Sequence, residues 1–230
     1  MKNTILISGT NRGIGLELVK YYANLGWRVY ACCREPDAAK ALSALADGDQ
    51  VILHKLDVSD SRQIQHLARE LSGEAIDILF NNAGIYGQAD AEFGNVDEQQ
   101  WLDCFRINAM SPLFVAEAFV NHVAASEKRL IATMSSKMGS MADNGSGGSY
   151  AYRSSKAAVN AVVKSMSIDL KPRGIKVVAL HPGWVLTDMG GPNAEITTEE
   201  SVKSLARNME SVNLENTGCF LDIDGSVIGW

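Results

Sequence analysis

Short apolar runs alternate with longer segments of helical periodicity along the whole chain, and this alternation limits the fold more than any other feature. The run from Thr4 to Ser8 is typical of a strand, and the segment from Gly13 to Leu25 is typical of a helix that Gly26 ends. Strands joined through helices of this length pair in parallel by right-handed crossovers. The pattern predicts one α/β domain over residues 1–230, with a doubly wound parallel sheet of about seven strands and helices on both faces.

The remaining segments continue this rhythm. Strands are expected over 27–33, 51–56, 76–80, 129–135, 176–181 and 219–222, and helices over 36–46, 60–71, 97–125, 150–170 and 199–209. The long helical region should break near Pro112. The Gly- and Ser-rich stretch 139–149 is too short to separate two domains, and we interpret it as an active-site loop.

Charge and composition argue against several function classes. The chain has 21 Lys and Arg against 27 Asp and Glu residues, a formal net charge of -6, so it has no basic field that would attract nucleic acid or an anionic membrane. Its apolar runs are too short for a signal peptide or a membrane span. The cysteines lack the spacing of a metal site, so we expect no metal, reduced thiols and a cytoplasmic location.

A glycine-rich turn, SGTNRGIG, directly follows the first strand and opens the first helix. Gly9, Gly13 and Gly15 would let the backbone approach a pyrophosphate, while the first N–H groups and the dipole of the helix face the anion. Three glycines alone are a weak signal, but their place between strand and helix favours a dinucleotide site over an ordinary tight turn.

The end of the second strand indicates which dinucleotide is bound. An acidic residue there would accept a hydrogen bond from a ribose hydroxyl, whereas an arginine would pair with a 2′-phosphate. Cys33 and Arg34 hold this place, and Arg12 lies on the glycine loop. NADP is therefore favoured over NAD. The alternative is that Arg34 only pairs with Glu35 or Asp37 on the surface.

Candidate catalytic residues lie on three segments. Tyr152 and Lys156 are four residues apart in YRSSK, so they share one helix face, where the ammonium would lower the pKa of the phenol and make it a general acid and base. Ser136 ends the fifth strand and would polarise a substrate carbonyl, whereas Ser135 should point to the opposite side. Asn108 lies inside a helix, where it either holds a water, kinks the helix or marks a helix end before Pro112.

Together these motifs resemble those of the single-domain short-chain dehydrogenases/reductases. The similarity runs from SGTNRGIG through LDVSD, NNAG, the Asn108 helix, MSSKMG and YRSSK to HPGWVLTDM. The resemblance implies a Rossmann-type fold in which Tyr152 transfers the proton and Ser136 holds the substrate oxygen. It also implies that Lys156 binds the nicotinamide ribose and assists Tyr152, and that Asn108 supports a water relay.

The same resemblance implies the cofactor contacts. Asp57 and Val58 match the adenine-binding pair, and members that prefer NADP usually carry basic residues where Arg12 and Arg34 stand. Besides Tyr152 and Lys156, the expected cofactor residues are Gly9, Asn11, Arg12, Gly13, Ile14, Gly15, Arg34, Asp57, Val58, Asn82, Ala83, Gly84, Pro182, Gly183, Val185 and Thr187. The motif YAYRSSK and the closing Trp230 are similar to the subgroup of C-factor-like proteins and sniffer-type carbonyl reductases.

The sequence therefore predicts an NADP(H)-dependent oxidoreductase that transfers hydride between the nicotinamide and a carbonyl or secondary alcohol, with reduction favoured. A pocket formed by Ile85, Tyr86, Met138, Met141 and Trp184 would suit apolar carbonyls, although all five could be ordinary packing. The alternative is a cofactor-binding regulatory or signalling protein without a physiological substrate. Two departures from many family members are a longer spacing between Ser136 and Tyr152 and a short segment after Thr187.

The helix at 150–170 is apolar on more than one face. One stripe should cover the sheet, and the other would meet a partner helix in a homodimer or homotetramer. Burial of both stripes within the monomer is the alternative.

Overall fold

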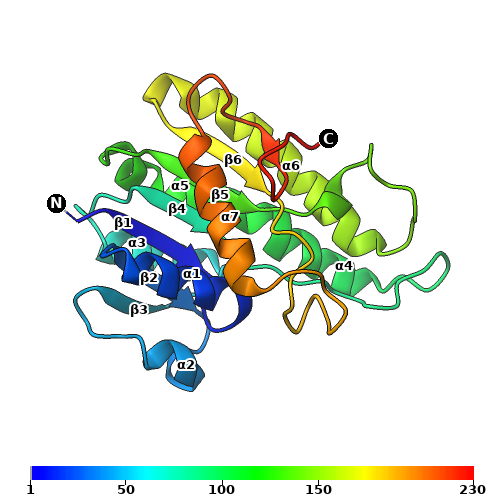
Figure 1. Cartoon of the computed structure of the whole chain (residues 1–230), viewed down its shortest axis with the longest axis horizontal. Coiled ribbons are helices and arrows are strands. Elements are labelled where there is room, and N and C mark those ends of the chain that lie inside the picture. The colour runs from blue at the N-terminus through cyan, green and yellow to red at the C-terminus, as the bar shows by residue number, and fades with distance from the viewer. Residues whose placement is uncertain (1) are drawn as a thin grey trace.

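One parallel sheet organises residues 2–230, the part of the chain that the computed structural model describes (Figure 1). Its strands are β1 (Thr4–Ser8), β2 (Arg28–Cys33), β3 (Val51–Lys55), β4 (Ile78–Asn81), β5 (Leu130–Met134), β6 (Lys176–Leu180) and β7 (Phe220–Leu221). They follow the order β3-β2-β1-β4-β5-β6-β7, and all neighbours pair in parallel. The predicted doubly wound sheet of seven strands is confirmed.

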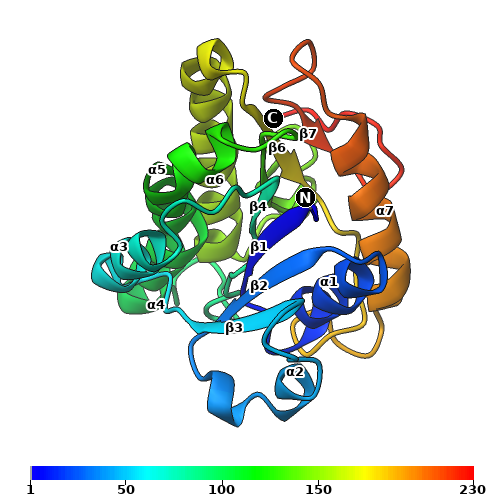
Figure 2. The same ribbon diagram turned by 90° about the vertical axis from the view of Figure 1, so that its left-hand side faces the viewer.

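Helices cover both faces of this sheet (Figure 2). One face carries α1 (Gly13–Asn24) and α7 (Thr198–Ser211), and the other carries α3 (Ser61–Glu70), α5 (Ser111–Ala124) and α6 (Tyr150–Leu170). Ile5 and Ile7 of β1 pack in the core under α1 and α7, whereas Leu6 packs in the core under α3, α5 and α6. Alternating strand side chains thus enter two separate cores, which explains why the strands are continuous apolar runs.

Two helical segments differ from the expectation. The helix expected over 36–46 is only a 3₁₀ turn (Pro36–Ala38) and α2 (Lys40–Ser43), because Asp47 accepts hydrogen bonds from the next backbone N–H groups and turns the chain into β3. The region over 97–125 is interrupted by a π-helical turn at Arg106–Met110, between α4 (Glu98–Phe105) and α5. The break thus lies just before Pro112, close to where it was expected, but Pro112 itself does not interrupt the helix. It lies in the first turn of α5, where its missing N–H costs no hydrogen bond.

The second apolar stripe of α6 is only partly covered. Val159 and Val163 are fully buried, whereas Ile168 is 63% exposed. The homodimer or homotetramer stays a prediction. Within residues 2–230, the structure contains no helix with the length and apolar character needed to cross a membrane.

Asp77 fastens the amino ends of the central strands, which generates a stability prediction. Its buried carboxylate accepts hydrogen bonds from the backbone N–H groups of Thr4 (2.9 Å) and Lys128 (3.2 Å). Asp77→Ala would leave a buried donor on Thr4 and a partly buried donor on Lys128 without partners, so it should lower the free energy of unfolding by about 2 kcal/mol in a urea titration. Asp49→Ala removes an exposed carboxylate and should cost less than about 0.5 kcal/mol. Equal losses in the two variants would contradict this role.

Candidate functional site

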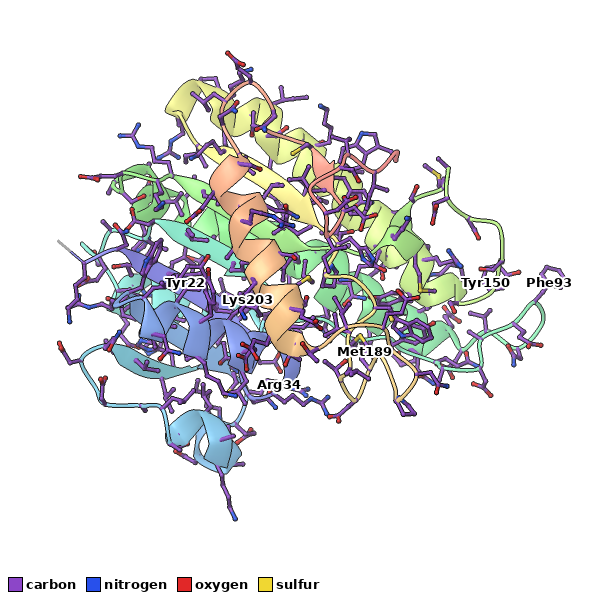
Figure 3. All side chains as sticks on the ribbon, viewed as in Figure 1. Tyr22, Arg34, Phe93, Tyr150, Met189 and Lys203 are labelled. Atoms are coloured by element: carbon purple, nitrogen blue, oxygen red, sulfur yellow. The ribbon has the colours of Figure 1, made fainter. Side chains whose placement is uncertain are left out.

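A cleft of about 560 Å³ opens at the carboxyl ends of the central strands, where the chain order of the sheet reverses between β1 and β4. Figure 3 shows two of its lining side chains, Arg34 and Met189, in the lower part of the view. Fourteen of the residues expected to bind the cofactor, apart from Tyr152 and Lys156, line it: Gly9, Asn11, Arg12, Gly13, Ile14, Gly15, Arg34, Asp57, Val58, Asn82, Ala83, Gly84, Pro182 and Thr187. Gly183 and Val185 do not line it: Val185 is buried, and Gly183 makes a turn at φ +82°.

The glycine loop after β1 makes a tight turn that lines the cleft at the start of α1. Gly9 and Gly13 have positive φ angles of 72° and 54°, and a Cβ on Gly15 would lie 2.1 Å from the carbonyl oxygen of Gly9. The first turn of α1 contains no acidic residue, so the positive end of its dipole is not neutralised from within the helix. The cleft volume and this cradle fit a dinucleotide whose pyrophosphate lies at the helix start.

A network between β1 and β4 holds that loop in place. The Ser8 hydroxyl accepts hydrogen bonds from the backbone N–H groups of Asn82 and Ala83, both at 3.1 Å. The Asn82 side chain donates to the carbonyl oxygens of Ser8 (2.9 Å) and Gly9 (3.0 Å). Sequence reasoning expected Asn82 to contact a cofactor but missed Ser8. A hydroxyl that ends an otherwise apolar, buried strand was the available signal.

Two arginines lie where a 2′-phosphate was expected. Arg34 is exposed at the cleft, and its neighbour Glu35 lies 3.8 Å from Lys55 rather than serving as the partner of Arg34. Arg12 forms an exposed ion pair of 2.6 Å with Asp188, in the segment before α7. Sequence reasoning missed Asp188, because a contact between residues 176 positions apart leaves no local signal. An exposed ion pair of this kind is weak and screened by salt, so the guanidinium of Arg12 can leave Asp188 at little cost.

Tyr152 and Lys156 lie on one face of α6 and are both buried, at 9% and 3% exposure. The Lys156 Nζ lies 5.7 Å from the centre of the Tyr152 ring and donates to the carbonyl oxygen of Met134 (2.9 Å). The expectation that the ammonium lowers the pKa of the phenol differs from the structure. Burial raises the pKa of Tyr152 to about 12, which the Ser136 hydroxyl partly offsets. Burial also lowers the pKa of Lys156 to about 8.

The two serines after β5 make different contacts. Ser136 is buried beside Tyr152, and its Oγ accepts from the backbone N–H of Met138 (3.2 Å) in a 3₁₀ turn. Ser135 instead donates to the side-chain oxygen of Asn160 on α6 (2.5 Å), which is a structural contact. Ser136 thus lies next to the phenol of Tyr152, although Ser135, and not Ser136, is among the residues that line the cleft.

Arg153 accommodates the long spacing between Ser136 and Tyr152. Its guanidinium donates to the carbonyl oxygens of Met138 (3.3 Å) and Gly147 (3.1 Å) and to the hydroxyl of Ser146 (2.7 Å). The extra residues of the loop are thus fastened to the residue next to Tyr152. Arg153 was not singled out in the sequence, where it is one more charged residue on a helix.

Asn108 lies in the π-helical turn rather than at a helix end. Its amide accepts from the backbone N–H of Ile85 (2.9 Å) and donates to the carbonyl of Ile85 (2.8 Å) and the hydroxyl of Ser155 (3.0 Å). A Cβ on Gly84 would lie 3.2 Å from the Asn108 Oδ1 and 3.6 Å from the Lys156 Nζ. Asn108 therefore anchors the segment after β4 and lies close to Lys156 across a glycine.

The buried ammonium of Lys156 generates a pH prediction. The unfolded chain keeps this proton up to its usual pKa of 10.5, whereas the folded protein loses it near pH 8, so stability should rise with pH between these values. Relative to Lys156→Met, the wild-type free energy of unfolding should increase by about 2 kcal/mol from about pH 8 to about pH 10.

Urea unfolding of the two proteins across this range measures the difference. Lys164→Met removes an exposed lysine from the same helix and serves as the control, which should follow the wild type. If the free energies of unfolding of the wild type and Lys156→Met changed in parallel with pH, burial would not lower the pKa of Lys156, and the prediction would be wrong.

Comparisons with known proteins agree with this arrangement. A family model described as short chain dehydrogenase matches residues 3–198. C-signal of Myxococcus xanthus is 45% identical over 155 residues, which cover 67% of this chain and 93% of that protein. The carbonyl reductase Sniffer of D. melanogaster superposes with a TM-score of 0.94 at 34% identity, over 100% of both chains. The NADPH-bound carbonyl reductase from chicken fatty liver superposes with a TM-score of 0.92 at 31% identity, also over 100% of both chains. This chain belongs to the short-chain dehydrogenase family of oxidoreductases.

Proposed function

We propose that this protein is an NADP(H)-dependent reductase of carbonyl compounds, with Tyr152 as the proton donor. The observation that carries the proposal is a buried phenol next to a buried hydroxyl and a buried ammonium, on Ser136 and Lys156, at a cleft shaped for a dinucleotide. Groups of this kind with shifted pKa values are characteristic of proton-transfer sites.

The cofactor would be held along the carboxyl ends of the strands. The start of α1 faces the pyrophosphate, Asp57 and Val58 lie at the adenine end, and Arg12 and Arg34 supply charge for a 2′-phosphate. When bound, the nicotinamide supplies the hydride. The fatty liver reductase, which has the same fold, was crystallised with NADPH. These points support NADP over NAD.

The proton chemistry follows from the three buried groups. The Ser136 hydroxyl and the Tyr152 phenol donate hydrogen bonds to the carbonyl oxygen of the substrate. As hydride reaches the carbonyl carbon, the phenol O–H bond breaks and its proton moves to the oxygen, giving a secondary alcohol from a ketone or a primary alcohol from an aldehyde. The ammonium of Lys156 lies close enough to stabilise the phenolate until solvent returns the proton.

The raised pKa of Tyr152 supports reduction as the working direction. Reduction needs the phenol, and oxidation needs the phenolate to remove the proton of an alcohol. A pKa of about 12 keeps nearly every molecule in the phenol form at neutral pH. Of the residues expected in the substrate pocket, Ile85 lines the cleft, whereas Met141 is 75% and Trp184 49% exposed and neither lines it. A regulatory protein without a substrate would have no use for this buried proton donor.

Tyr152→Phe removes the proton donor and keeps the ring. It should lower kcat for benzaldehyde or menadione by about a hundredfold to ten-thousandfold, because the general acid is lost. The dissociation constant of NADPH should stay within about twofold, since the glycine loop is untouched. Tyr150→Phe, on the exposed neighbouring tyrosine, is the matched control and should turn over like the wild type. Wild-type turnover in Tyr152→Phe would reject the proposed function.

Arg34→Ala tests recognition of the 2′-phosphate. A guanidinium that binds this phosphate makes charge-assisted hydrogen bonds, so its loss should weaken NADPH by about tenfold or more and leave NADH within about twofold. Fluorescence titration with each cofactor measures both constants. Arg62→Ala removes an exposed arginine that does not line the cleft, and it should change neither. Equal weakening of NADPH and NADH by Arg34→Ala would argue against the proposed preference.

A further inference from the structure

The ring of Tyr152 is stacked on a second tyrosine ring. The centroids of Tyr86 and Tyr152 lie 4.5 Å apart with an angle of 26° between the planes, an offset arrangement that aromatic pairs prefer. Tyr86 belongs to the segment after β4, and Tyr152 belongs to the first turn of α6. The stack therefore joins two segments that border the cleft, and it covers one face of the candidate proton donor.

The hydroxyl of Tyr86 is tied to the residue that precedes α6. Tyr86 Oη and Ser149 Oγ form a hydrogen bond of 2.9 Å. Ser149 adopts a left-handed conformation, with φ 47°, although it is not a glycine, and its hydroxyl does not cap α6. Its backbone N–H donates to the carbonyl of Ala91 (3.0 Å). The Ser149 hydroxyl thus forms a hydrogen bond with Tyr86 instead of capping α6.

The backbone of Tyr86 is fixed from the other side. Its carbonyl oxygen accepts from the buried thiol of Cys104 on α4 (3.6 Å), and the preceding residue, Ile85, is held by Asn108. The following residue, Gly87, has no room for a side chain, because a Cβ there would lie 2.6 Å from the Cys104 Sγ. Three consecutive residues are therefore locked against α4 and the π-helical turn, so the Tyr86 ring is a rigid support.

We propose that Tyr86 and Ser149 form a clamp that positions the ring of Tyr152 for proton transfer. The clamp consists of the stack of the Tyr86 ring on the Tyr152 ring and the hydrogen bond between the hydroxyls of Tyr86 and Ser149. This inference rests on the proposed function, because it concerns the same phenol. Tyr86 and Ser149 are positioning residues in this proposal, since they act on the substrate through Tyr152. Misplacement of a reacting group by about 1 Å lowers rates by orders of magnitude. A rigid support for the Tyr152 ring should therefore increase the rate of proton transfer.

The test uses Tyr86→Phe, Ser149→Ala and the double variant, with benzaldehyde or menadione as substrate. Each single change removes the same hydrogen bond, so each should lower kcat by about fivefold to tenfold with KM and the NADPH dissociation constant within about twofold. The double variant should have a kcat no lower than that of the less active single variant, because both single changes remove the same hydrogen bond and no second interaction remains to be lost. Tyr150→Phe is the matched control. Its ring is exposed at the edge of the molecule (Figure 3), and it should keep the wild-type kcat.

A second readout does not depend on turnover. Tyr86→Ala removes the stacked ring and admits water to Tyr152, so the pKa of the Tyr152 phenol should fall below its wild-type value of about 12 in an absorbance titration referenced to Tyr152→Phe. Tyr86→Phe keeps the ring that excludes water, so the pKa of Tyr152 in this variant should stay above its value in Tyr86→Ala.

Three results would overturn the clamp: wild-type kcat in both single variants, multiplied losses in the double variant, or an unchanged Tyr152 pKa in Tyr86→Ala. If Tyr86→Ala does not fold, the two conservative variants still decide. Failure of the clamp is distinguishable from failure of the proposed function. An inactive Tyr152→Phe together with a fully active Tyr86→Phe rejects only the clamp, whereas an active Tyr152→Phe rejects the function on which it rests.

Discussion

The close approach of α6 to the end of β5 is the constraint on which the rest of the site depends. Gly139 permits it, because a Cβ at this position would lie 2.7 Å from the Cβ of Lys156. The approach removes Tyr152 and Lys156 from water and brings the ammonium within hydrogen-bond distance of the Met134 carbonyl. A parallel sheet with every strand ending at one edge then places the glycine loop and the buried pair at the same cleft.

Burial sets the protonation states in this arrangement. In a medium of low dielectric the charged forms of both groups are disfavoured, so the phenol of Tyr152 holds its proton more tightly and the ammonium of Lys156 holds its proton less tightly. The hydrogen bond with the Ser136 hydroxyl lowers the pKa of Tyr152 against the effect of burial, and the electrostatic interaction with Tyr86 raises it further. A neutral phenol can donate its proton to a carbonyl oxygen, and a nearby cation stabilises the phenolate that remains. Carbonyl reduction requires this combination.

Much of this could be predicted from the sequence because the signals are local. Apolar runs mark the strands, glycines between β1 and α1 mark the phosphate loop, and a spacing of four places Tyr152 and Lys156 on one face. The helix expected over 36–46 was predicted too long, because the side chain of Asp47 binds the backbone N–H groups that follow it and turns the chain into β3.

Other features depend on contacts between distant segments. The pKa of Tyr152 was expected to fall, and it rises because spacing reveals a neighbouring charge but not the depth of burial. The Arg12–Asp188 pair and the hydrogen bond between Tyr86 and Ser149 each join two different loops that are far apart in the sequence and that only the fold brings together. The π-helical turn at Asn108 likewise follows from the bonds of its side chain to Ile85, not from helix propensity.

The protonation state of Tyr152 is the point at which the account is most directly open to measurement. Ring-carbon chemical shifts of the protein labelled at tyrosine, assigned through Tyr152→Phe, would follow this phenol across a pH titration. The account predicts a phenol that stays neutral well beyond the ordinary tyrosine value of 10.0 and ionises near 12. Ionisation at or below the ordinary value would mean that the phenol of Tyr152 is not removed from water, and the account of the site as a buried proton donor would then be wrong.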